Sequence, residues 1–441
     1  MVAPRFALAS LLLSGIVAFG CAEEGPQLAV RSGSDAKPTR PTKAEDKDED
    51  AIPEPPAPLD DDAAFAQDLR KLPELRAALT DPEKYRVEVL FTEVRPGKGK
   101  DAKPELVRHA FRVDREYFYP ASAIKLTAAV ATLEALAERG RARNFVYPPD
   151  SAMRIFDSSA GVYVENDPTD FVTGKLSIAH ELKKMLVISD NESFNRLYAF
   201  VGHKEMNTRM WRLGLPTVRI RHRLGNMVKD FDDPTMTPEV SIVPGGGGPE
   251  LVTPERSSSL SLGPITDAGT MVGKSHYEGN SLVAGPMDFS EKNRIGIRDL
   301  QRLLQKVVLP DAEPGPTPRY DDAGRALLLS LLSMLPSQSR LTGFDTSLDE
   351  IQKLSYPGIT RAVAANKIRL YGKSGRAYGF SIENSYVTDP ETKRGFFLTA
   401  AIYTNEGGAV GSDQYQYVEI ANPFFAGLGE YCARRVFARP K

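Results

Sequence analysis

Cysteine is scarce in this sequence, with only Cys21 and Cys432 among 441 residues. No CxxC pair and no Cys/His cluster with zinc spacing occurs. Cys21 stands at the end of an N-terminal apolar segment, where processing would consume its thiol. No intramolecular disulfide is then possible, so the fold must be held together by its apolar core.

A surplus of either charge is also missing, because the formal net charge is -2. The chain therefore offers no basic field for nucleic acid and no acidic field for a cationic partner. The GxSxG elbow, the P-loop and the Rossmann fingerprint do not occur, and we expect no metal and no cofactor. The histidines are scattered without metal-ligand spacing: His109, His180, His203, His222 and His276.

The first twenty residues hold the apolar run "FALASLLLSGIVAFG", which is shorter than the roughly 20 residues of a membrane span. A basic residue before the run and a small residue at its end are typical of a secretory signal peptide. Cys21 after Gly20 resembles a bacterial lipobox, although Ala18 replaces the usual leucine and Phe19 is bulky. We predict a signal peptide over residues 1–20, lipidation of Cys21, and export to the periplasm or cell envelope on a membrane anchor.

The next segment, residues 21–60, is rich in Pro, Asp, Glu and Lys and poor in aromatic and branched apolar residues. Such a composition predicts a disordered tether. Stiffened by proline and extended by like charges, it would hold a domain at residues 61–441 roughly tens of Å from the membrane. We expect that domain to be a monomer.

Strand patterns occur at both ends of this domain, and helical patterns fill its middle. Residues 83–94 place Val87, Val89 and Phe91 on one face, which is typical of a half-buried strand. Short turns separate the late strands, so they should be antiparallel. We predict an α+β fold in which strands from both chain ends form one antiparallel sheet, covered by helices and joined to a helical subdomain. The other predicted strands are 105–114, 367–375, 379–389 and 395–406, and the helical stretches are 119–215, 290–335 and 414–437.

Between these patterns, residues 221–290 contain a run of four glycines and many turn-forming residues. We predict a long inserted loop here, either a functional cover or a mobile segment.

The first chemical motif is "PASAIKL", in which Ser122 and Lys125 lie three residues apart. On a helix both side chains emerge on one face, where a lysine of lowered pKa can take the proton of a serine nucleophile. The alternative is a helix cap, because serine is a favoured N-cap and a chance copy of the spacing occurs at Ser34 and Lys37. An apolar stripe would bury the helix through Leu126, Val130, Leu133 and Ala137.

The second motif is "SDN", where Ser189, Asp190 and Asn191 interrupt an apolar helical run. A hydroxyl and an amide in a cleft could relay a proton and bind a carbonyl, while Asp190 holds the loop. The alternative is a turn followed by an N-cap.

The third motif is "KSG", where Lys373, Ser374 and Gly375 end a predicted strand. Lysine and a hydroxyl could bind a carboxylate, and the glycine would let a substrate backbone approach closely. The alternative is a hairpin turn, and "GKS" recurs at Gly273–Ser275.

Together and in this order, the three motifs resemble the SxxK, SDN and K[ST]G signature of class A β-lactamases and penicillin-binding proteins. The order of elements is similar over about residues 61–437, apart from an unmatched insertion at 221–286. The resemblance implies that Ser122 is the acylated nucleophile and Lys125 its proton acceptor, and that Ser189 passes a proton to the leaving nitrogen.

The same resemblance implies a set of binding groups for a small-molecule β-lactam or a peptidoglycan peptide. Asn191 would bind the substrate amide, and Lys373 and Ser374 its carboxylate. The backbone N–H groups of Ser122 and Arg376 would form the oxyanion hole.

The residues that would hydrolyse the acyl-enzyme are not evident. Class A members use a glutamate and an asparagine between the second and third motifs, but an ungapped alignment puts Leu224 in the glutamate position. Counting back from the helix after the insertion gives Glu278 and Asn280 instead, and we predict Glu278 as the base. All five acidic candidates, Glu278 included, fit equally well as solvated loop charges. The other four are Asp230, Asp232, Asp233 and Glu239.

Three functions remain open. The first is a β-lactamase that turns over through a Ser122 acyl-enzyme. The second is a D,D-peptidase or penicillin-binding protein acting on cell-wall peptide. The third is an envelope binding module or antibiotic sensor without turnover, in which Ser122→Ala would keep its affinity for the ligand.

Overall fold

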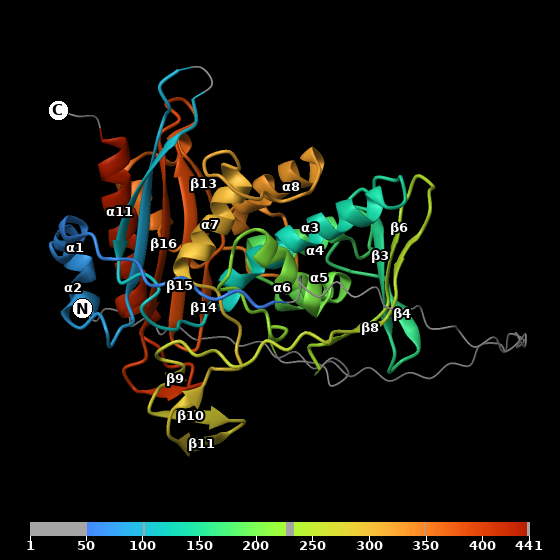
Figure 1. Ribbon diagram of the computed structural model, residues 1–441, viewed down its shortest axis with the longest axis horizontal. Coiled ribbons are helices and arrows are strands. Elements are labelled where there is room, and N and C mark those ends of the chain that lie inside the picture. The colour runs from blue at the N-terminus through green and yellow to red at the C-terminus, as the bar shows by residue number, and fades with distance from the viewer. Residues whose placement is uncertain (1–50, 100–101, 226–232, 348, 439–441) are drawn as a thin grey trace, which may run out of the picture. The chain divides into compact units, whose positions relative to one another are not determined.

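The computed structural model describes residues 51–99, 102–225, 233–347 and 349–438 (Figure 1). The predicted signal peptide and Cys21 therefore lie outside the described residues. Within these ranges, no helix is both long and apolar enough to cross a membrane.

The end of the predicted tether packs against the folded domain. The carbonyl of Pro53 accepts a hydrogen bond of 2.8 Å from the Arg219 guanidinium, and the N–H of Leu59 donates to the carbonyl of Val113 at 3.2 Å. The predicted boundary at residue 61 is therefore too late. An extended proline-rich backbone leaves carbonyls free, and here side chains of the domain bind them.

Strands from both chain ends form one antiparallel sheet, in the order β13-β15-β16-β1-β2, with β14 paired to β15. The prediction of an α+β fold is thus confirmed. The bounds are β1 Glu88–Arg95, β2 Glu105–Phe111, β13 Arg369–Gly372, β14 Gly375–Ala377, β15 Phe380–Thr388 and β16 Gly395–Tyr403.

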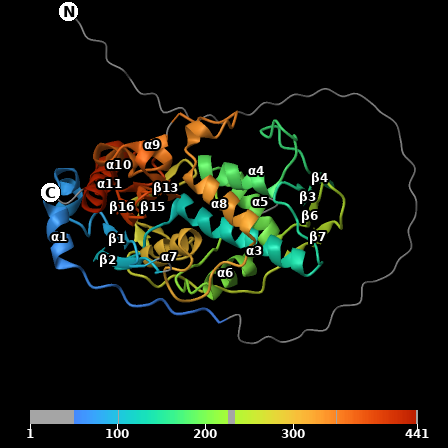
Figure 2. The ribbon, with the colours of Figure 1, turned by 90° about the horizontal axis from the view of Figure 1, so that it is seen from above.

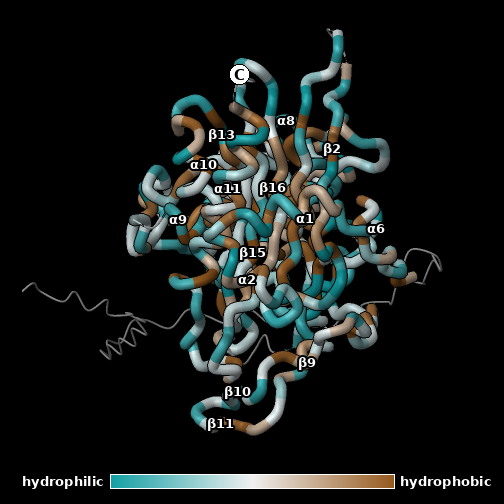
Figure 3. Tube along the Cα trace, turned by 90° about the vertical axis from the view of Figure 1, so that its left-hand side faces the viewer, coloured by the Kyte–Doolittle hydropathy of each residue, from teal (hydrophilic) through white to brown (hydrophobic). Residues whose placement is uncertain are grey.

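Helices cover both faces of this sheet (Figures 1 and 2). Val87, Val89 and Phe91 share one core cluster with side chains of α11, whereas Leu90 belongs to the cluster on the other face. The predicted face is right, but the strand is buried on both faces, not half-buried. Figure 3 shows α1, α10 and α11 on the near face of the sheet. The covering helices are α1 Ala63–Arg70, α10 Tyr356–Ala362 and α11 Asn422–Phe437 on that face, and α7 Ile297–Val308 on the other.

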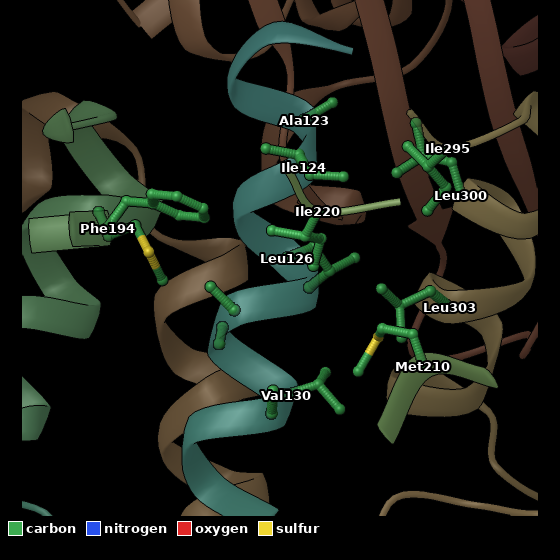
Figure 4. Close-up of a cluster of buried hydrophobic side chains, with 14 of the residues drawn as sticks. Ala123, Ile124, Leu126, Val130, Phe194, Met210, Ile220, Ile295, Leu300 and Leu303 are labelled. Atoms are coloured by element: carbon green, nitrogen blue, oxygen red, sulfur yellow. The ribbon is translucent and has the colours of Figure 1, made fainter. Parts of the chain in front are cut away.

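Helix α3, Lys125–Arg141, runs through the apolar cluster on the α7 side of the sheet, the cluster to which Leu90 belongs. Figure 4 shows Phe194 of α5 on one side of α3 and Leu303 of α7 on the other. The predicted apolar stripe is buried except for the half-buried Ala137, but Thr127 and Glu134 are buried as well. The helix is therefore enclosed on all sides over its first three turns. Helices α5 Asn191–Val201, α6 His203–Arg212 and α7 pack against α3, and the helical part also contains α4 Ile178–Lys183 and α8 Asp322–Ser333.

The segment 221–290 is not a bare loop, because its described residues form short strands. Strand β6 joins a sheet in the order β4-β3-β6-β7, and β10 and β11 form a hairpin at the lower edge of Figures 1 and 3. β3 and β4 also interrupt the predicted helical middle. These strands are β3 Ala152–Asp157, β4 Val162–Val164, β5 Met236–Thr237, β6 Val240–Val243, β7 Leu251–Thr253, β8 Arg256–Ser257, β9 Met271–Val272, β10 Ser275–Glu278, β11 Ser281–Ala284, β12 Met287–Asp288 and, after the insertion, β17 Ala409–Val410.

Short helical turns complete the described structure, and two of them lead into the chemical motifs. The 3-10 turn Ala121–Ile124 holds Ser122, and the π-helical turn Lys184–Ile188 ends immediately before Ser189. The others are Pro73–Leu75, α2 Arg76–Thr80, Pro336–Gln338, α9 Asp349–Gln352, Ala365–Lys367 and Tyr417–Ala421.

Candidate active site

Ser122 lies at the entrance to α3, in the 3-10 turn that precedes the helix. The N–H of Lys125 donates to the carbonyl of Ser122, so the two residues belong to one helical turn. Ser122 is half-buried, whereas Lys125 is fully buried. The residue before the serine, Ala121, has a φ of 47°, a left-handed conformation that costs an alanine free energy. Such strain is typical of functional sites.

The second motif begins with a similar strained residue. Ser189 has a φ of 65° and ends the π-helical turn, an uncommon element that often marks functional sites. Asp190 caps α5, because its carboxylate accepts a 2.7 Å hydrogen bond from the N–H of Ser193. The predicted role of Asp190 in holding the loop is therefore confirmed, and the cap directs the chain between Ser189 and Asn191.

The side chains of all three motifs meet around the hydroxyl of Ser189. The Lys125 ammonium lies 3.3 Å from Ser189 Oγ and 2.7 Å from Asn191 Oδ1, and it also donates to the Ser189 carbonyl. From the other side, Lys373 Nζ donates to Ser189 Oγ at 3.0 Å and to the Ser374 carbonyl at 2.9 Å. One hydroxyl thus stands between two lysine side chains.

Both lysines are buried, and neither forms an ion pair with a carboxylate among the described residues. Burial lowers the pKa of Lys125 to about 7, against a small opposing effect of the Asp190 charge. Burial also lowers the pKa of Lys373 well below its usual value, and the positive charges of Lys125 and Lys353 lower it further. Within the described ranges, no ion pair joins a carboxylate to Lys125. A neutral amine is therefore available to accept a proton near neutral pH.

The third motif lies between β13 and β14, beside the start of α3. A Cβ atom on Gly375 would come within 2.7 Å of the Ser122 backbone nitrogen and 2.6 Å of that of Ala123. Only glycine permits this approach of strand and helix. The prediction that Gly375 makes room for a substrate backbone therefore needs correction, since the close neighbour is the chain around the serine.

Ser374 and Arg376 flank this glycine and point to different neighbours. The Ser374 hydroxyl donates a 2.8 Å hydrogen bond to the carbonyl of Gln352. The Arg376 guanidinium lies 5.1 Å from the centre of the Tyr417 ring and donates to Asn422 Oδ1. The side chain of Arg376 is thus occupied by the C-terminal segment, which leaves its backbone as the part beside the serine.

The predicted base Glu278 is not part of this arrangement. It lies at the end of β10, where 72% of its side chain is exposed and its contact is to His276 at 3.4 Å. Asn280, in the hairpin turn, is exposed too. In the described part of the chain, no hydrogen bond or ion pair links Glu278 to a residue of the three motifs. The structure gives the Glu278 assignment no support, because the insertion folds into a hairpin of its own and exposes this carboxylate to solvent.

Leu224 lies next to the second motif. Its N–H and carbonyl are both held at 2.9 Å by the side chain of Asn195. The next residue, Gly225, faces Asn191, since a Cβ atom on it would lie 3.2 Å from Asn191 Nδ2. The chain thus passes beside the site here with an apolar side chain, which cannot activate water.

The other acidic candidates give no base among the described residues. Asp233 accepts from Thr235, and Glu239 accepts from the Tyr163 hydroxyl, and neither contact involves a residue of the three motifs. Asp230 and Asp232 lie outside the described residues.

Sequence reasoning missed a buried polar layer directly behind the third motif. Lys353 Nζ donates at 2.6 Å to the carbonyl of Gly372, the residue before Lys373. Glu383 accepts from the Leu354 N–H at 2.9 Å and the Ser355 hydroxyl at 3.1 Å. The sequence signal for this layer was Glu383, a carboxylate in the middle of the apolar pattern of residues 379–389.

Several solved structures that resemble this chain are described as β-lactamases. One from Desulfarculus baarsii has 17% identity and a TM-score of 0.46, covering 85% of this chain and 98% of that chain. One from Burkholderia vietnamiensis has 14% identity and a TM-score of 0.46, covering 86% and 98%. A class A enzyme from Mycobacterium abscessus has 17% identity and a TM-score of 0.42, covering 84% and 98%.

Protein-family models give a local match, and no curated protein matches the chain. The model described as "Beta-lactamase enzyme family" matches residues 108–245. This segment contains Ser122, Lys125, Ser189 and Asn191, four of the residues whose side chains or backbone form the site. The resemblance that the motifs suggested is thereby confirmed: the chain is similar to β-lactamases in the segment that carries its first two motifs.

Proposed function

We propose that this protein is a serine hydrolase that opens β-lactam rings by transferring the acyl group to Ser122. The observation that carries the proposal is the position of Lys125. It is fully buried, lies one turn from Ser122, contacts Ser189, and has a pKa lowered to about 7 by burial. A lysine in this state can act as a base at neutral pH.

Acylation begins when Lys125 accepts the proton of the Ser122 hydroxyl. The serine oxygen then attacks the lactam carbonyl, and negative charge develops on the carbonyl oxygen. Gly375 brings β14 against the backbone nitrogen of Ser122. The N–H groups of Ser122 and Arg376 can therefore donate to this oxygen from two sides.

Ring opening requires a proton on the leaving nitrogen, and Ser189 is suited to supply it. Lys373 donates to Ser189 Oγ at 3.0 Å, so the proton of the hydroxyl is free for another acceptor. Ser189 Oγ also lies 3.3 Å from Lys125 Nζ, which holds the proton taken from Ser122. The proton can pass from Lys125 through Ser189 to nitrogen, and the acyl-enzyme is left with both lysines unchanged.

Release of the acyl group needs a water molecule and a base. Among the described residues, the position beside Asn191 is taken by Leu224 and Gly225, and Glu278 is exposed and forms no hydrogen bond or ion pair with the motifs. This favours a second candidate, a penicillin-binding protein or sensor in which the acyl-enzyme persists.

Intact-mass spectrometry of the chain from residue 22, mixed with benzylpenicillin, separates these functions. We expect an adduct of the mass of the penicillin that is absent from Ser122→Ala. An adduct that decays while nitrocefin is hydrolysed indicates a β-lactamase, and one that lasts for hours indicates the second candidate. An unmodified wild-type protein would contradict the proposal.

For the cell we propose export and a lipid anchor at Cys21, based on the lipobox-like N-terminus. Labelling of expressing bacteria with a clickable palmitate analogue should mark the wild-type protein and not Cys21→Ala. Equal labelling of the two would place the lipid elsewhere, and an unlabelled wild type would contradict the anchor.

A further inference from the structure

The residue that links the second motif to the third is Gln352, the last residue of α9. Its Nε2 donates to the carbonyl of Ile188 at 3.5 Å, and its Oε1 accepts from Lys373 Nζ at 3.4 Å. Its own carbonyl accepts the Ser374 hydroxyl at 2.8 Å. The half-buried Gln352 thus contacts both groups that the third motif offers to a carboxylate.

These contacts compete with an anionic ligand. A serine hydroxyl has one proton, and Ser374 donates it to the backbone carbonyl of Gln352, a contact that substitution of the Gln352 side chain leaves in place. The two side-chain hydrogen bonds of Gln352 are long, at 3.4 and 3.5 Å, and therefore weak. A carboxylate that replaced them would form charge-assisted hydrogen bonds, which are about twice as strong as neutral ones.

We propose that the side chain of Gln352 determines specificity, by holding Lys373 Nζ in the carboxylate subsite until an anionic substrate displaces this side chain. The inference rests on the proposed function, since it concerns the substrate of the same site. An amide is suited to this position because it accepts from Lys373 Nζ without adding a negative charge, so the ion pair is left for a substrate carboxylate, which would itself favour the charged form of the lysine.

Two substitutions at this position should act in opposite directions. Gln352→Ala removes the competing amide and should tighten the binding of a carboxylate ligand by about threefold to tenfold, the equivalent of one hydrogen bond. Gln352→Glu keeps the size but adds a negative charge beside Lys373, and should weaken the binding of the same ligand by about tenfold or more. Ile351→Ala, an exposed neighbour on α9, is the matched control and should change neither.

The test measures binding by isothermal titration calorimetry in a Ser122→Ala background, so that it does not depend on acylation. The ligands are benzylpenicillin and its uncharged methyl ester. Each is titrated into the Ser122→Ala protein and into the same protein with Gln352→Ala, Gln352→Glu or Ile351→Ala added. For the acid, we expect the dissociation constant to fall in Gln352→Ala and to rise in Gln352→Glu. For the ester, we expect the dissociation constant to change by less than about twofold in both variants. Equal shifts for acid and ester, shifts of the same sign in both variants, or no preference for the acid in any of the proteins would overturn the proposal.

The two proposals fail in different ways. A missing adduct on wild-type Ser122 contradicts the proposed function, whatever the calorimetry gives. Intact acylation with no carboxylate-dependent effect of the Gln352 substitutions contradicts only the specificity role.

Discussion

Two buried lysines, Lys125 and Lys184, occupy contrasting surroundings on either side of the second motif. Lys184 is 3% exposed and lies 2.8 Å from the carboxylate of Glu181, with Asp167 as a second carboxylate partner. Lys125 is 0% exposed, and the groups to which it donates are neutral: the carbonyl and hydroxyl of Ser189 and the amide oxygen of Asn191.

The difference shows how one residue type serves structure in one place and chemistry in another. A buried lysine that forms ion pairs with carboxylates ties segments together, here the loop of Asp167 to α4. A buried ammonium among neutral oxygens gains little from its charge, so desolvation dominates and its pKa falls to about 7. Burial therefore makes a lysine a base at neutral pH only where no carboxylate pairs with its ammonium group.

Replacing each lysine by methionine tests this contrast most directly. Lys125→Met should reduce the rate of Ser122 acylation by about 10²–10⁴-fold, because it removes the general base. Stopped-flow or quenched mass spectrometry with benzylpenicillin measures this rate. An acylation rate within threefold of wild type would show that another group takes the serine proton.

The matched substitution Lys184→Met should act on stability instead. It leaves Asp167 and Glu181 buried with Arg196 as their remaining cation, so the free energy of unfolding should fall by about 3–5 kcal/mol. Urea denaturation measures this change, and the folded fraction should still acylate at nearly the wild-type rate. A large loss of acylation in folded Lys184→Met would remove the distinction between the two lysines.

A carboxylate placed beside Lys125 should give this lysine an ion-pair partner, as Lys184 has in the wild type. In the wild type the base is the neutral amine, so acylation should rise with pH and level off above the Lys125 pKa of about 7. Asn191→Asp places a carboxylate where Oδ1 now lies 2.7 Å from Nζ and should raise that pKa. Each tenfold gain in the proton affinity of Lys125 lowers the acylation rate at pH 7 by up to about tenfold and moves the plateau to higher pH.

The control for this pH profile is Asn191→Ala, which removes the same contact without adding charge. This variant should not move the plateau of the acylation rate to higher pH. A profile that shifts equally in both variants would assign the effect to the lost amide and not to the new charge.

The smallest effect is expected at Glu278, which is part of neither the proton transfer around Lys125 nor the buried ion pairs around Lys184. Because its side chain is 72% exposed on the β10–β11 hairpin, Glu278→Gln should change the acyl-enzyme lifetime and nitrocefin turnover by less than about twofold. A tenfold longer lifetime of the acyl-enzyme would restore this residue as the deacylation base.

Much of the fold was predictable because its signals are local. Alternation of apolar residues identified the strands at both chain ends, and helical periodicity identified α7, α8 and α11. The segment 221–290 was predicted wrongly as a loop because its strands are two to four residues long, too short to show a period. Their partners, such as β3 for β6 and β17 for β10, lie far away in sequence.

The sequence by itself determined which chemical groups are present and in what order: a serine and a lysine one turn apart, the "SDN" turn, and the "KSG" strand end. Tertiary structure decided what these groups can do. Only packing removes water and carboxylates from Lys125, sets Gly375 against Ser122, and brings Gln352 onto Lys373 across 21 positions of the chain. Charge state and proximity depend on neighbours distant in sequence, and no local pattern records them.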